Sequence, residues 1–549
     1  MTARDCMQPR GADVVARALE RAGARIVFTL SGNHIMPIFD AVLETGLRLV
    51  HCRHEAAAVH MADAWARVTG ACGVALVTGG PGHANAVPAL YTALAAESPV
   101  VLLSGHASLG EIGRGSFQEM RQAELAEPVA KASWTVRSAS ELEGDVERAF
   151  RLAMSGRPGP VHVSLPFDVL EAAPAVADQQ MGLAPADSAG RTLSELELRS
   201  VLAALASAER PLILAGPLLC RLAAGEGLAR LGAALKVPAI GMESPRGVND
   251  PSLGAFADLL PRADLILLLG KKHDFTLRFA EPPFVDANCR FMVIDPEAEA
   301  VERVAREKRD RLVLSVLADP AFAADQLSKA GSSRHPGDAW YSEAARAIAY
   351  RPPEWEAPRS SDGGGVDPVT LCQTIDRTLR EAEKPLFICD GGEVGQWGQC
   401  LVSTPRRIIN GVAGSIGAAI PFALGARAAD PQATIIALSG DGAFGFHMTE
   451  FDTAVRYGLA FVAVIGNDAA WNAEHQMQLR TYGAQRAHGC ELLRTRYDDV
   501  VKALGGHGEL VTTADQLLPA LERAIGSGKP ACVNVLVPRV AAPVVRLPA

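Results

Sequence analysis

Short apolar runs alternate with helical stretches along the whole chain, and this alternation limits the possible folds more than any other feature. In the first third of the chain the runs are RIVFTLSG, LRLVHC, VALVTGG, PVVLLSG and GPVHVSLP. Each is apolar enough to be buried on both faces, which is typical of strands in a parallel sheet covered by helices. The pattern recurs from PLILAG to RFMVIDP and from PLFICDGG to ACVNVLVP. The sequence therefore predicts an α/β fold of three doubly wound parallel-sheet domains.

The chain is long enough for three domains, because 549 residues exceed the size at which a single core stops growing. Residues 176–190 lose the periodic pattern and are predicted to be a linker. A second break, rich in Pro, Gly and Ser, runs over residues 334–366, and Asp367 and Pro368 after it are suited to cap and begin a helix. The expected domains are therefore residues 1–175, 191–335 and 367–540.

Composition argues against several classes of protein. Hydrophobic residues make up 48% and charged residues 21% of the chain, which is ordinary for a globular protein and speaks against disorder. The net charge of −9, without a cluster of Lys and Arg among aromatic residues, argues against a nucleic-acid partner. The ten cysteines form no CxxC pair, the N-terminus lacks an apolar leader, and no run of eighteen apolar residues occurs. We therefore expect a cytoplasmic protein with reduced thiols and no membrane partner.

Two predicted strands of the third domain end in acidic residues. ALSGDG ends at Gly440, Asp441 and Gly442, and AFVAVIGND ends at Asp468, 27 residues after Asp441. Ligands of an open parallel sheet bind outside the carboxyl ends of its strands, so Asp441 and Asp468 are expected to converge on a cation. Mg²⁺ held by a few protein oxygens and completed by phosphate and water suits this arrangement, and the glycines would let a phosphate approach the backbone. An ordinary Asp-Gly turn is the alternative.

These strand ends resemble the thiamine diphosphate motif, and two upstream segments resemble the glutamate helix and GPG loop of the acetolactate synthase superfamily: RHEAAAVHMADAWARVTG and ALVTGGPGHANAV. The order of four further segments is similar to that of the family, so the resemblance covers nearly the whole chain: SGNHIMPIFDA, GSFQEMRQAELAEPVAKASW, RPGPVHVSLPFDV and NGVAGSIGAAIPFALGA. It implies a pyrimidine-binding first domain, a middle domain and a third domain that binds diphosphate and magnesium.

The resemblance also implies roles for single residues. Glu55 would hydrogen-bond the aminopyrimidine of thiamine diphosphate and stabilise the tautomer that deprotonates thiazolium C2, giving an ylid that attacks a carbonyl and a ring that holds the carbanion. Asp441, Asp468 and the Ala470 carbonyl would hold magnesium, and Asp468 stands where the family usually has asparagine. Without the resemblance, Glu55 is an ordinary helix-terminal carboxylate and Ile416 an ordinary core residue. The residues implied in cofactor binding are Glu55, Gly391, Gly392, Glu393, Val394, Gly414, Ile416, Gly440, Asp441, Gly442, Ala443, Asp468 and Trp471.

By the same resemblance, the substrate pocket is lined by Ser31, Asn33, His34, Phe117, Gln118, Trp471 and Asn472. Two of these residues, His34 and Gln118, join Glu55 as candidate catalytic residues. His34 matches a histidine of benzaldehyde lyase and could relay protons to a substrate hydroxyl. The alternative is that His34 is a satisfied polar histidine of a loop.

The resemblance implies a lyase, carboligase or 2-oxo acid decarboxylase that acts on a small carbonyl compound. A 2-hydroxyacyl-CoA lyase or oxalyl-CoA decarboxylase is the alternative, because the middle segments GMESPRGVNDPSLGAF and LLGKKHDFTLRFA are similar to those enzymes. For the same reason FAD, which acetolactate synthases retain, is not favoured. The short C-terminal segment VNVLVPRVAAPVVRLPA leaves little material for a lid over CoA.

Two hypotheses from other classes stay open: a catalytically degenerate homologue that binds the cofactor, and a plain nucleotide-binding protein. The absence of a P-loop lysine disfavours the second. The family joins its pyrimidine and diphosphate domains across subunits, so the resemblance implies a homodimer or homotetramer with the site at the subunit interface. That assembly would bring together Glu55 and Asp441, which lie far apart in the chain.

Overall fold

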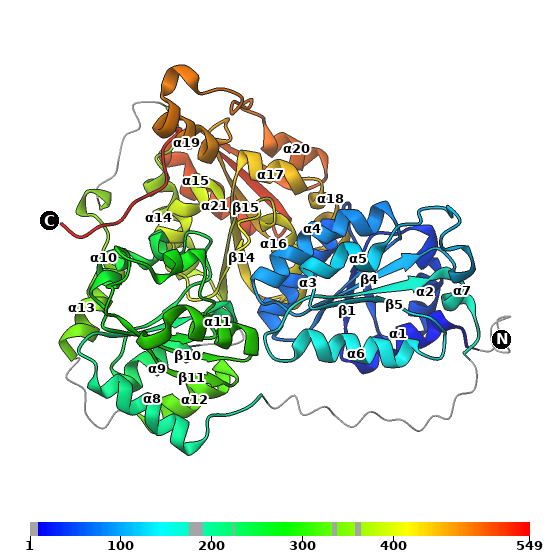
Figure 1. The fold of residues 1–549 in the computed structure, drawn as a ribbon. Helices are drawn as coiled ribbons and strands as arrows, with labels where there is room; N and C mark the ends of the chain where they lie inside the picture. Colours follow the sequence, from blue (N-terminus) through cyan, green and yellow to red (C-terminus); the bar gives the residue numbers. More distant parts are fainter. Residues whose placement is uncertain (1–8, 175–189, 223–225, 332–337, 357–363, 549) are drawn as a thin grey trace. The chain divides into compact units, whose positions relative to one another are not determined.

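The computed structural model describes residues 9–174, 190–222, 226–331, 338–356 and 364–548. The chain divides into two compact units. The first unit comprises residues 1–188, 421–431 and 449–459, and the second comprises residues 189–420, 432–448 and 460–549. One parallel sheet in the first unit and two in the second confirm the predicted α/β fold of three sheets (Figure 1).

The first unit is built on a six-stranded parallel sheet with the order β2-β1-β3-β4-β6-β5. Its strands β3, β4 and β6 are buried along their whole length, as their unbroken apolar sequences predict. The strands are β1 (Ile26–Thr29), β2 (Arg48–His51), β3 (Gly73–Val77), β4 (Val100–His106), β5 (Ala132–Thr135) and β6 (Val161–Pro166). The helices are α1 (Gly11–Arg21), α2 (Met36–Ala41), α3 (Glu55–Thr69), α4 (Pro81–Ala95), α5 (Gln122–Ala126), α6 (Leu142–Met154) and α7 (Phe167–Glu171), joined by most of α16 (Ala419–Ala429) and by α18 (Glu450–Tyr457).

The segment HIMPIFDAVLETG forms a helical stretch of three parts. A 3-10 turn (Asn33–Ile35) precedes α2, and a second 3-10 turn (Val42–Glu44) follows it. Pro37 lies in the first turn of α2, where its missing N–H is tolerated, so the α-helix begins there and the residues before it form a separate turn. An α-helix with a 3-10 turn at each end therefore covers residues 33–44.

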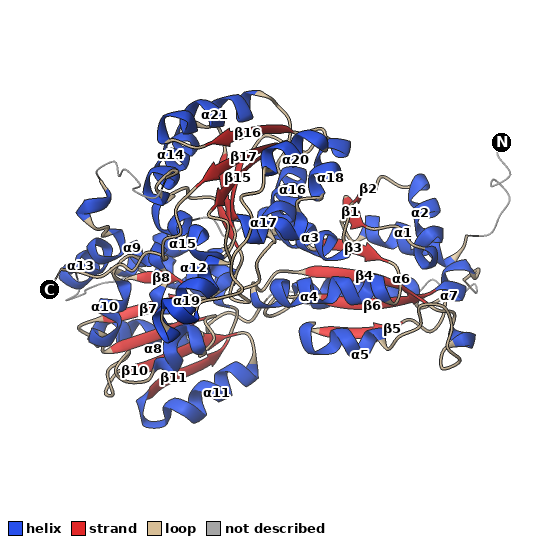
Figure 2. Ribbon diagram, turned by 90° about the horizontal axis from the view of Figure 1, so that it is seen from above, coloured by secondary structure: helices blue, strands red, loops and turns tan. Residues whose placement is uncertain are grey.

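The second unit contains a middle sheet and a C-terminal sheet, both parallel, with helices beside their strands (Figure 2). The middle sheet has the strand order β11-β10-β9-β7-β8. Its strands are β7 (Pro211–Ala215), β8 (Ala239–Gly241), β9 (Leu265–Leu269), β10 (Arg290–Asp295) and β11 (Leu312–Leu317). Its helices are α8 (Glu195–Ser207), α9 (Gly227–Leu235), α10 (Phe256–Leu259), α11 (Ala298–Lys308), α12 (Pro320–Ala330) and α13 (Asp338–Ala349).

The C-terminal sheet has the order β13-β12-β14-β15-β17-β16, so four strands whose loops carry the predicted cofactor residues are neighbours. Asp367 caps α14 by accepting a hydrogen bond from Val369 N (2.9 Å), as predicted. The strands are β12 (Pro385–Cys389), β13 (Arg407–Ile409), β14 (Thr434–Gly440), β15 (Val462–Asn467), β16 (His507–Val511) and β17 (Ala531–Leu536). The helices are α14 (Pro368–Glu381), α15 (Gly392–Leu401), α17 (Asp441–His447), α19 (Asn472–Tyr482), α20 (Tyr497–Ala503) and α21 (Ala514–Gly526).

Three strands, β5, β11 and β16, are not among the predicted apolar runs. Each lies at the edge of its sheet. Each also mixes buried residues with half-buried or exposed ones, or has none fully buried, so its sequence lacks an unbroken apolar run. Edge position therefore explains why the apolar pattern misses these strands.

The expected domain boundaries lie partly outside the described residues. Most of the predicted linker, 176–190, lies outside the described residues. The Pro-rich break at 334–366 contains helix α13, whose Trp340 is 4% exposed and donates Nε1 to Pro211 O (2.9 Å), so this helix packs on the middle sheet. The bounds 1–175, 191–335 and 367–540 stay a prediction. Among the described residues, no helix has the length and apolar character needed to cross a bilayer.

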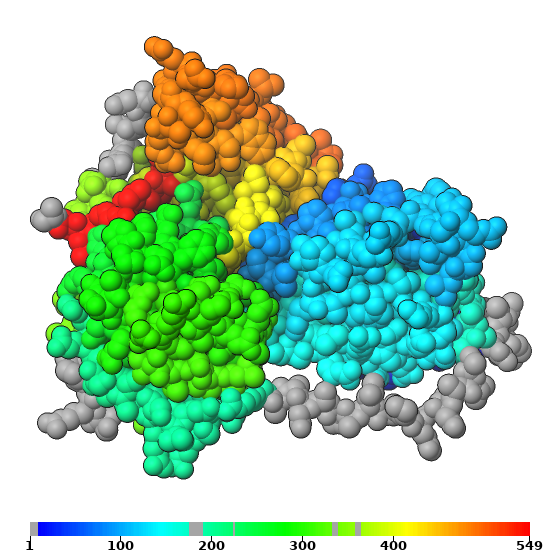
Figure 3. All heavy atoms as spheres, viewed as in Figure 1, coloured from blue at the N-terminus to red at the C-terminus, as the bar shows by residue number. Residues whose placement is uncertain are grey.

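The C-terminal segment, residues 537–548, is bonded to other parts of the second unit at two places. Asn472 Nδ2 donates to Val540 O (2.9 Å), and Arg546 pairs with Asp258 (3.0 Å). In Figure 3 this segment, in red, lies against the green atoms of the middle region. The segment therefore connects the start of α19 with the residues around α10.

Candidate functional site

A cavity of about 300 Å³ opens in the second unit at the carboxyl ends of β12, β13, β14 and β15. Parallel strands direct the loops that follow them to one edge of the sheet, which is why residues from four loops meet there. The cavity gathers all the predicted cofactor, metal and pocket residues of the third domain: Gly391, Gly392, Glu393, Val394, Gly414, Ile416, Gly440, Asp441, Gly442, Ala443, Asp468, Ala470, Trp471 and Asn472.

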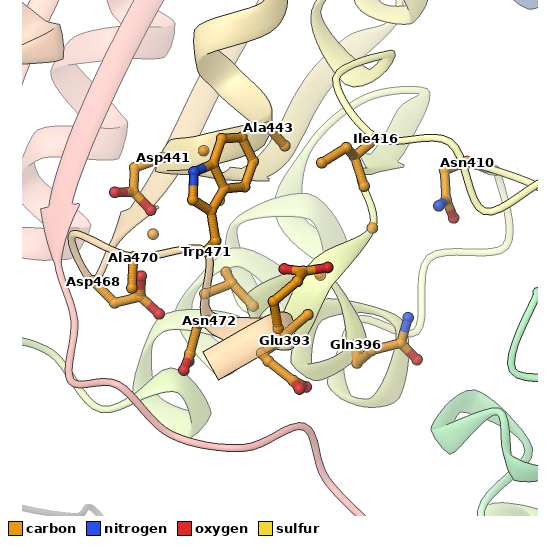
Figure 4. A pocket seen from close by; sticks show the side chains of 18 of the residues that line it. Glu393, Gln396, Asn410, Ile416, Asp441, Ala443, Asp468, Ala470, Trp471 and Asn472 are labelled. Carbon is orange, nitrogen blue, oxygen red and sulfur yellow. The ribbon is translucent and has the colours of Figure 1, made fainter. Parts of the chain in front are cut away.

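Two carboxylates lie together on one side of this cavity. Strands β14 and β15 pair in parallel, with Gly440 opposite Gly466, so Asp441 and Asp468 leave the sheet side by side (Figure 4). Burial raises the pKa of both carboxyls, and the charge of Asp441 raises the pKa of Asp468 further. Asp441 Oδ2 is buried and has no hydrogen-bond partner among the described residues. A cation placed between the two carboxylates would satisfy this oxygen and offset their repulsion.

Hydrogen bonds to backbone groups hold the loop after β15 in place. The Asp468 side chain is not used in these bonds and lines the cavity. Arg539 donates Nε to Asp468 O (3.0 Å) and Nη2 to Ala469 O (2.7 Å). Asn467 is fully buried, and its Oδ1 accepts a hydrogen bond from Ala469 N (3.3 Å). Ala469 has a φ of 55°, a left-handed conformation that costs a non-glycine residue free energy and that these bonds maintain.

Helix starts also line the same cavity. Helices α15 and α19 begin at Gly392 and Asn472, both of which line it. Unpaired N–H groups and the helix dipole favour an anion at such positions. No atom of the described residues lies within 4 Å of the place where a Cβ would stand on Gly392 or Gly440, which leaves room for a phosphate against the backbone. Gln396 Oε1 and Asn410 Oδ1 also line the cavity and, among the described residues, have no partner.

Ile416 and Trp471 pack directly on glycine backbones and so narrow the cavity. A Cβ on Gly391 would lie 2.9 Å from Ile416 Cγ2, and a Cβ on Gly442 would lie 2.7 Å from two ring carbons of Trp471. In Figure 4 the Trp471 indole stands between Asp441 on one side and Ile416 on the other. The indole ring thus separates the acidic pair from the part of the cavity that Ile416 lines.

Asp390 holds this arrangement together, and the sequence reasoning missed it. Its buried carboxylate accepts hydrogen bonds from Gly391 N (2.8 Å), Gly417 N (3.0 Å) and Ala419 N (3.2 Å), and burial raises its pKa. These bonds tie the loop that carries Ile416 to the end of β12. Asp390 directly follows a predicted strand, so the strand-end argument applied to Asp441 could have found it.

In the first unit, the predicted residues collect around the loop Thr78–Gly82. Glu55 is the first residue of α3, is 8% exposed and accepts a hydrogen bond from Asn85 Nδ2 (3.1 Å). A Cβ on Gly82 would lie 3.2 Å from Glu55 Oε1, so the carboxylate faces the start of α4 closely. One oxygen of Glu55 is thus engaged by an amide, and the other lies against a glycine that leaves space beside it.

His34, Phe117 and Gln118 meet the same loop. His34 is 7% exposed, its Nδ1 lies 3.3 Å from Thr78 Oγ1, and its ring stacks on Phe117 with centroids 6.1 Å apart. Burial, followed by the charge of His106, lowers the pKa of His34. Gln118 has a φ of 56°, and a Cβ on Gly80 would lie 2.6 Å from its carbonyl oxygen. His34 is therefore a buried neighbour of the loop.

Ser31 and Asn33 are both exposed. Ser31 Oγ lies 3.0 Å from His51 Nε2, and the Asn33 side chain forms no hydrogen bond with the described residues. Gly32 between them packs on Thr78, where a Cβ would lie 2.3 Å from Thr78 Cβ. The two side chains therefore flank the loop without joining Glu55.

Two further residues of this unit were missed. Gln122, 1% exposed, accepts from Gly80 N (2.8 Å) and donates to Gly105 O (3.0 Å) and Ser164 Oγ (3.1 Å). Glu450 is fully buried and accepts from Arg53 N (2.9 Å), which precedes α3. The partners of Gln122 lie 17 to 42 positions away, so no local pattern marks this residue. Glu450 accepts from the nearby Thr453 Oγ1 (2.6 Å), but its partner Arg53 N is 397 positions away.

Comparisons with known proteins agree with these two sets of residues. Residues 9–125 match the model described as "Thiamine pyrophosphate enzyme, N-terminal TPP binding domain", and residues 390–535 match "Thiamine pyrophosphate enzyme, C-terminal TPP binding domain". The chain is 34% identical over 545 residues to a probable acetolactate synthase of Mycobacterium bovis and to the acetolactate synthase large subunit IlvG of Mycobacterium tuberculosis, covering 96% of each. It is 30% identical to human 2-hydroxyacyl-CoA lyase 2, covering 96% of this chain and 90% of the relative.

Proposed function

Since the chain belongs to the thiamine pyrophosphate enzymes of the acetolactate synthase family, we propose that it is a lyase or carboligase that makes or breaks a carbon–carbon bond beside a carbonyl group. When bound, thiamine diphosphate supplies a nucleophilic carbon and a ring that accepts the electron pair left by the broken bond. One observation carries the proposal: the cavity in the second unit combines an acidic pair, open glycine backbones and helix starts, which together suit a metal diphosphate.

Asp441, Asp468 and the Ala470 carbonyl are proposed to hold Mg²⁺. The unpartnered Asp441 Oδ2 and the raised pKa of both carboxyls support this assignment, because buried acids of this kind are stabilised by a hard cation. Gly392 and Gly440 leave open space for the phosphates, and Ile416 presents an apolar side chain to the rest of the cofactor.

Glu55 is proposed to bind the pyrimidine of the cofactor and to exchange a proton with it. Its burial at a helix start and its single amide partner support this role, since the second carboxyl oxygen remains available. His34 is proposed to hold and move the proton of a substrate hydroxyl beside the segment 78–82, and Gln118 is proposed to hydrogen-bond the same hydroxyl. For His34 the lowered pKa supports a neutral imidazole that can accept a proton near neutral pH.

The two sets of residues belong to different compact units, and we propose that they meet in a homodimer, or a tetramer of such dimers. The first unit of one copy would then complete the cavity of the other. Sedimentation velocity with and without cofactor tests this proposal. A monomer that is fully active would contradict it.

A second candidate reaction is the cleavage of the carbon–carbon bond beside the thioester carbonyl of a 2-hydroxyacyl-CoA. The observation in its favour is the match to 2-hydroxyacyl-CoA lyase 2 over 96% of the chain, a share equal to that of the acetolactate synthases. In either reaction the chain's own residues would perform the same binding and proton-holding steps.

The deciding experiment supplies the purified protein with thiamine diphosphate and Mg²⁺ and then offers pyruvate, benzoin and a 2-hydroxyacyl-CoA. Consumption of a donor, with loss of activity in Glu55→Gln, is the expected result. If calorimetry shows that the cofactor binds while no donor is consumed, the chain is a degenerate homologue and the proposed reaction fails.

A further inference from the structure

A second cavity of about 450 Å³ lies in the second unit next to the proposed cofactor cavity. We call it the aromatic cavity; it is lined by Pro245, Arg246, Asn249, Phe275, Arg278, Phe279 and Phe284. Pro245 and Arg246 line both cavities, so the two adjoin at these residues. No role in cofactor binding explains the remaining residues.

The aromatic cavity exposes three phenylalanine side chains. Phe275 is 50% exposed, Phe279 is 56% exposed and Phe284 is 42% exposed. Grouped apolar rings in contact with water are unfavourable for the free protein, and such a group marks a binding surface. Aromatic rings bind other aromatic rings best, by offset stacking or edge-to-face contact.

Two guanidinium groups accompany the rings. Arg278 lies over the ring of Phe284, 5.3 Å from its centroid. Arg246 has one loose partner, Glu393 at 3.9 Å, and Glu393 is itself bound by Ala542 N (2.7 Å). Within the described ranges Arg246 forms no further ion pair and Arg278 forms none, so both can bind an anion. Arg246, at the boundary of the two cavities, can hold a carboxylate between them.

The backbone that presents the phenylalanines is strained and firmly held. Arg278, Phe279 and Ala280 have φ values of 51°, 53° and 47°, three successive non-glycine residues in the left-handed region. The buried Lys308 ammonium donates to Phe279 O (3.0 Å) and to Ala280 O (3.2 Å). Strained backbone persists where surrounding bonds enforce it, and it commonly occurs at ligand sites.

The same segment is fixed at its other end. Asp274 accepts hydrogen bonds from Lys271 Nζ (3.0 Å) and Thr276 N (3.0 Å). Gly247 lies so close that a Cβ on it would stand 2.0 Å from Thr276 O. The segment therefore keeps one shape against the residues that follow Arg246, and the exposed rings are positioned before any ligand arrives.

We infer that the aromatic cavity is the substrate side-chain subsite of this enzyme, and that it selects an aryl-substituted 2-oxo or 2-hydroxy acid. The aryl ring binds among Phe275, Phe279 and Phe284, and the carboxylate pairs with Arg246, which directs the adjacent carbonyl carbon into the cofactor cavity. The inference rests on the proposed function and names the class of its substrate.

The test compares phenylpyruvate with pyruvate as donors for the holoenzyme. Phe279→Ala is expected to lower the ratio of kcat/KM for phenylpyruvate to that for pyruvate about tenfold. Phe322→Ala, which changes a phenylalanine of α12 that is 43% exposed and outside both cavities, should keep the wild-type ratio. Phe275→Ala provides a second variant with the same expected change. An unchanged ratio in both cavity variants overturns the inference.

Calorimetric titration with phenylpyruvate separates this inference from the proposed function. If wild type binds phenylpyruvate and Phe279→Ala does not, the subsite stands even when no donor is turned over. If pyruvate is consumed but phenylpyruvate neither binds nor reacts, the subsite is wrong and the proposed function stands. Should Phe279→Ala shift the sedimentation coefficient and leave the donor ratio unchanged, the surface is an interface between copies, which also overturns the inference.

Discussion

Asp441 and Asp468 are two buried acids with little positive charge around them. Arg539 is the cation that lowers the pKa of Asp468, but burial and the charge of Asp441 outweigh it. Arg539 Nε donates a hydrogen bond to the backbone carbonyl of Asp468. The protein alone therefore leaves the pair undersatisfied, and a divalent cation is the group best suited to complete it.

Asp468→Asn should retain Mg²⁺ and cofactor binding. The amide oxygen can still serve as a ligand, and removing one charge relieves the repulsion from Asp441. Calorimetric titration of thiamine diphosphate with Mg²⁺ should give a Kd within a few-fold of wild type, whereas Asp441→Asn should weaken binding because Asp441 carries the unpartnered oxygen. Loss of binding in Asp468→Asn would show that the second charge is required.

Glu450 should make the stability of the protein depend on pH. Burial raises its pKa to about 7 from 4.5, so between those pH values the folded protein holds a proton that the unfolded chain has released. The free energy of unfolding should therefore fall as pH rises through this window, by roughly 1–3 kcal/mol from this group. Urea unfolding at pH 5 and pH 8 should show a smaller difference in Glu450→Gln than in wild type. Glu522→Gln, at an exposed position, should leave the difference unchanged.

At the scale of single elements, Gln122 connects three parts of the first unit. It is the first residue of α5, and its carboxamide links the loop before α4, the end of β4 and strand β6. All three bonds are buried, so none can be replaced by water without opening the unit. The position of Gly80, and with it that of Gln118, depends on this one side chain.

Gln122→Met keeps the size of the side chain and removes these bonds. Leaving Gly80 N and Gly105 O buried and unpaired should lower the free energy of unfolding by about 2 kcal/mol. Denaturant unfolding measures this loss. Gln373→Met, which removes a single half-buried bond to Trp355 O, should cost less. Equal losses in the two variants would mean that the carboxamide does not join the three elements.

At the scale of the whole molecule, the central strands could be predicted, because a strand buried on both faces has an unbroken apolar sequence. The acidic strand ends could be predicted too, because the carboxyl ends of parallel strands lie at the same edge of the sheet. The edge strands β5, β11 and β16 could not, since their residues are partly exposed. Gln122 and Glu450 could not either. Arg53 and Glu450 are 397 positions apart, and only the folded chain brings them together.

Only some of the residues proposed to contact the substrate could be predicted from the sequence, for a related reason. The resemblance assigned His34 and Gln118 to one predicted pocket. The structure adds their neighbours, because Thr78 contacts His34 and Gly80 packs on the Gln118 backbone. Phe275 and Phe279 lie in a short 3-10 helix (Phe275–Ala280), and Phe284 follows it. None of the three belongs to an apolar periodic pattern, so only their shared cavity reveals them.

The proposed function depends on Glu55 controlling the reactive carbon of thiamine diphosphate. The most direct measurement is hydrogen–deuterium exchange at C2 of the bound cofactor, in wild type and in Glu55→Gln, with cofactor saturation checked by calorimetry. We predict fast exchange in wild type and exchange slower by at least about 100-fold in the variant, because proton transfer at C2 would depend on this carboxylate. Equal exchange rates in the two proteins, both saturated with cofactor, would contradict it.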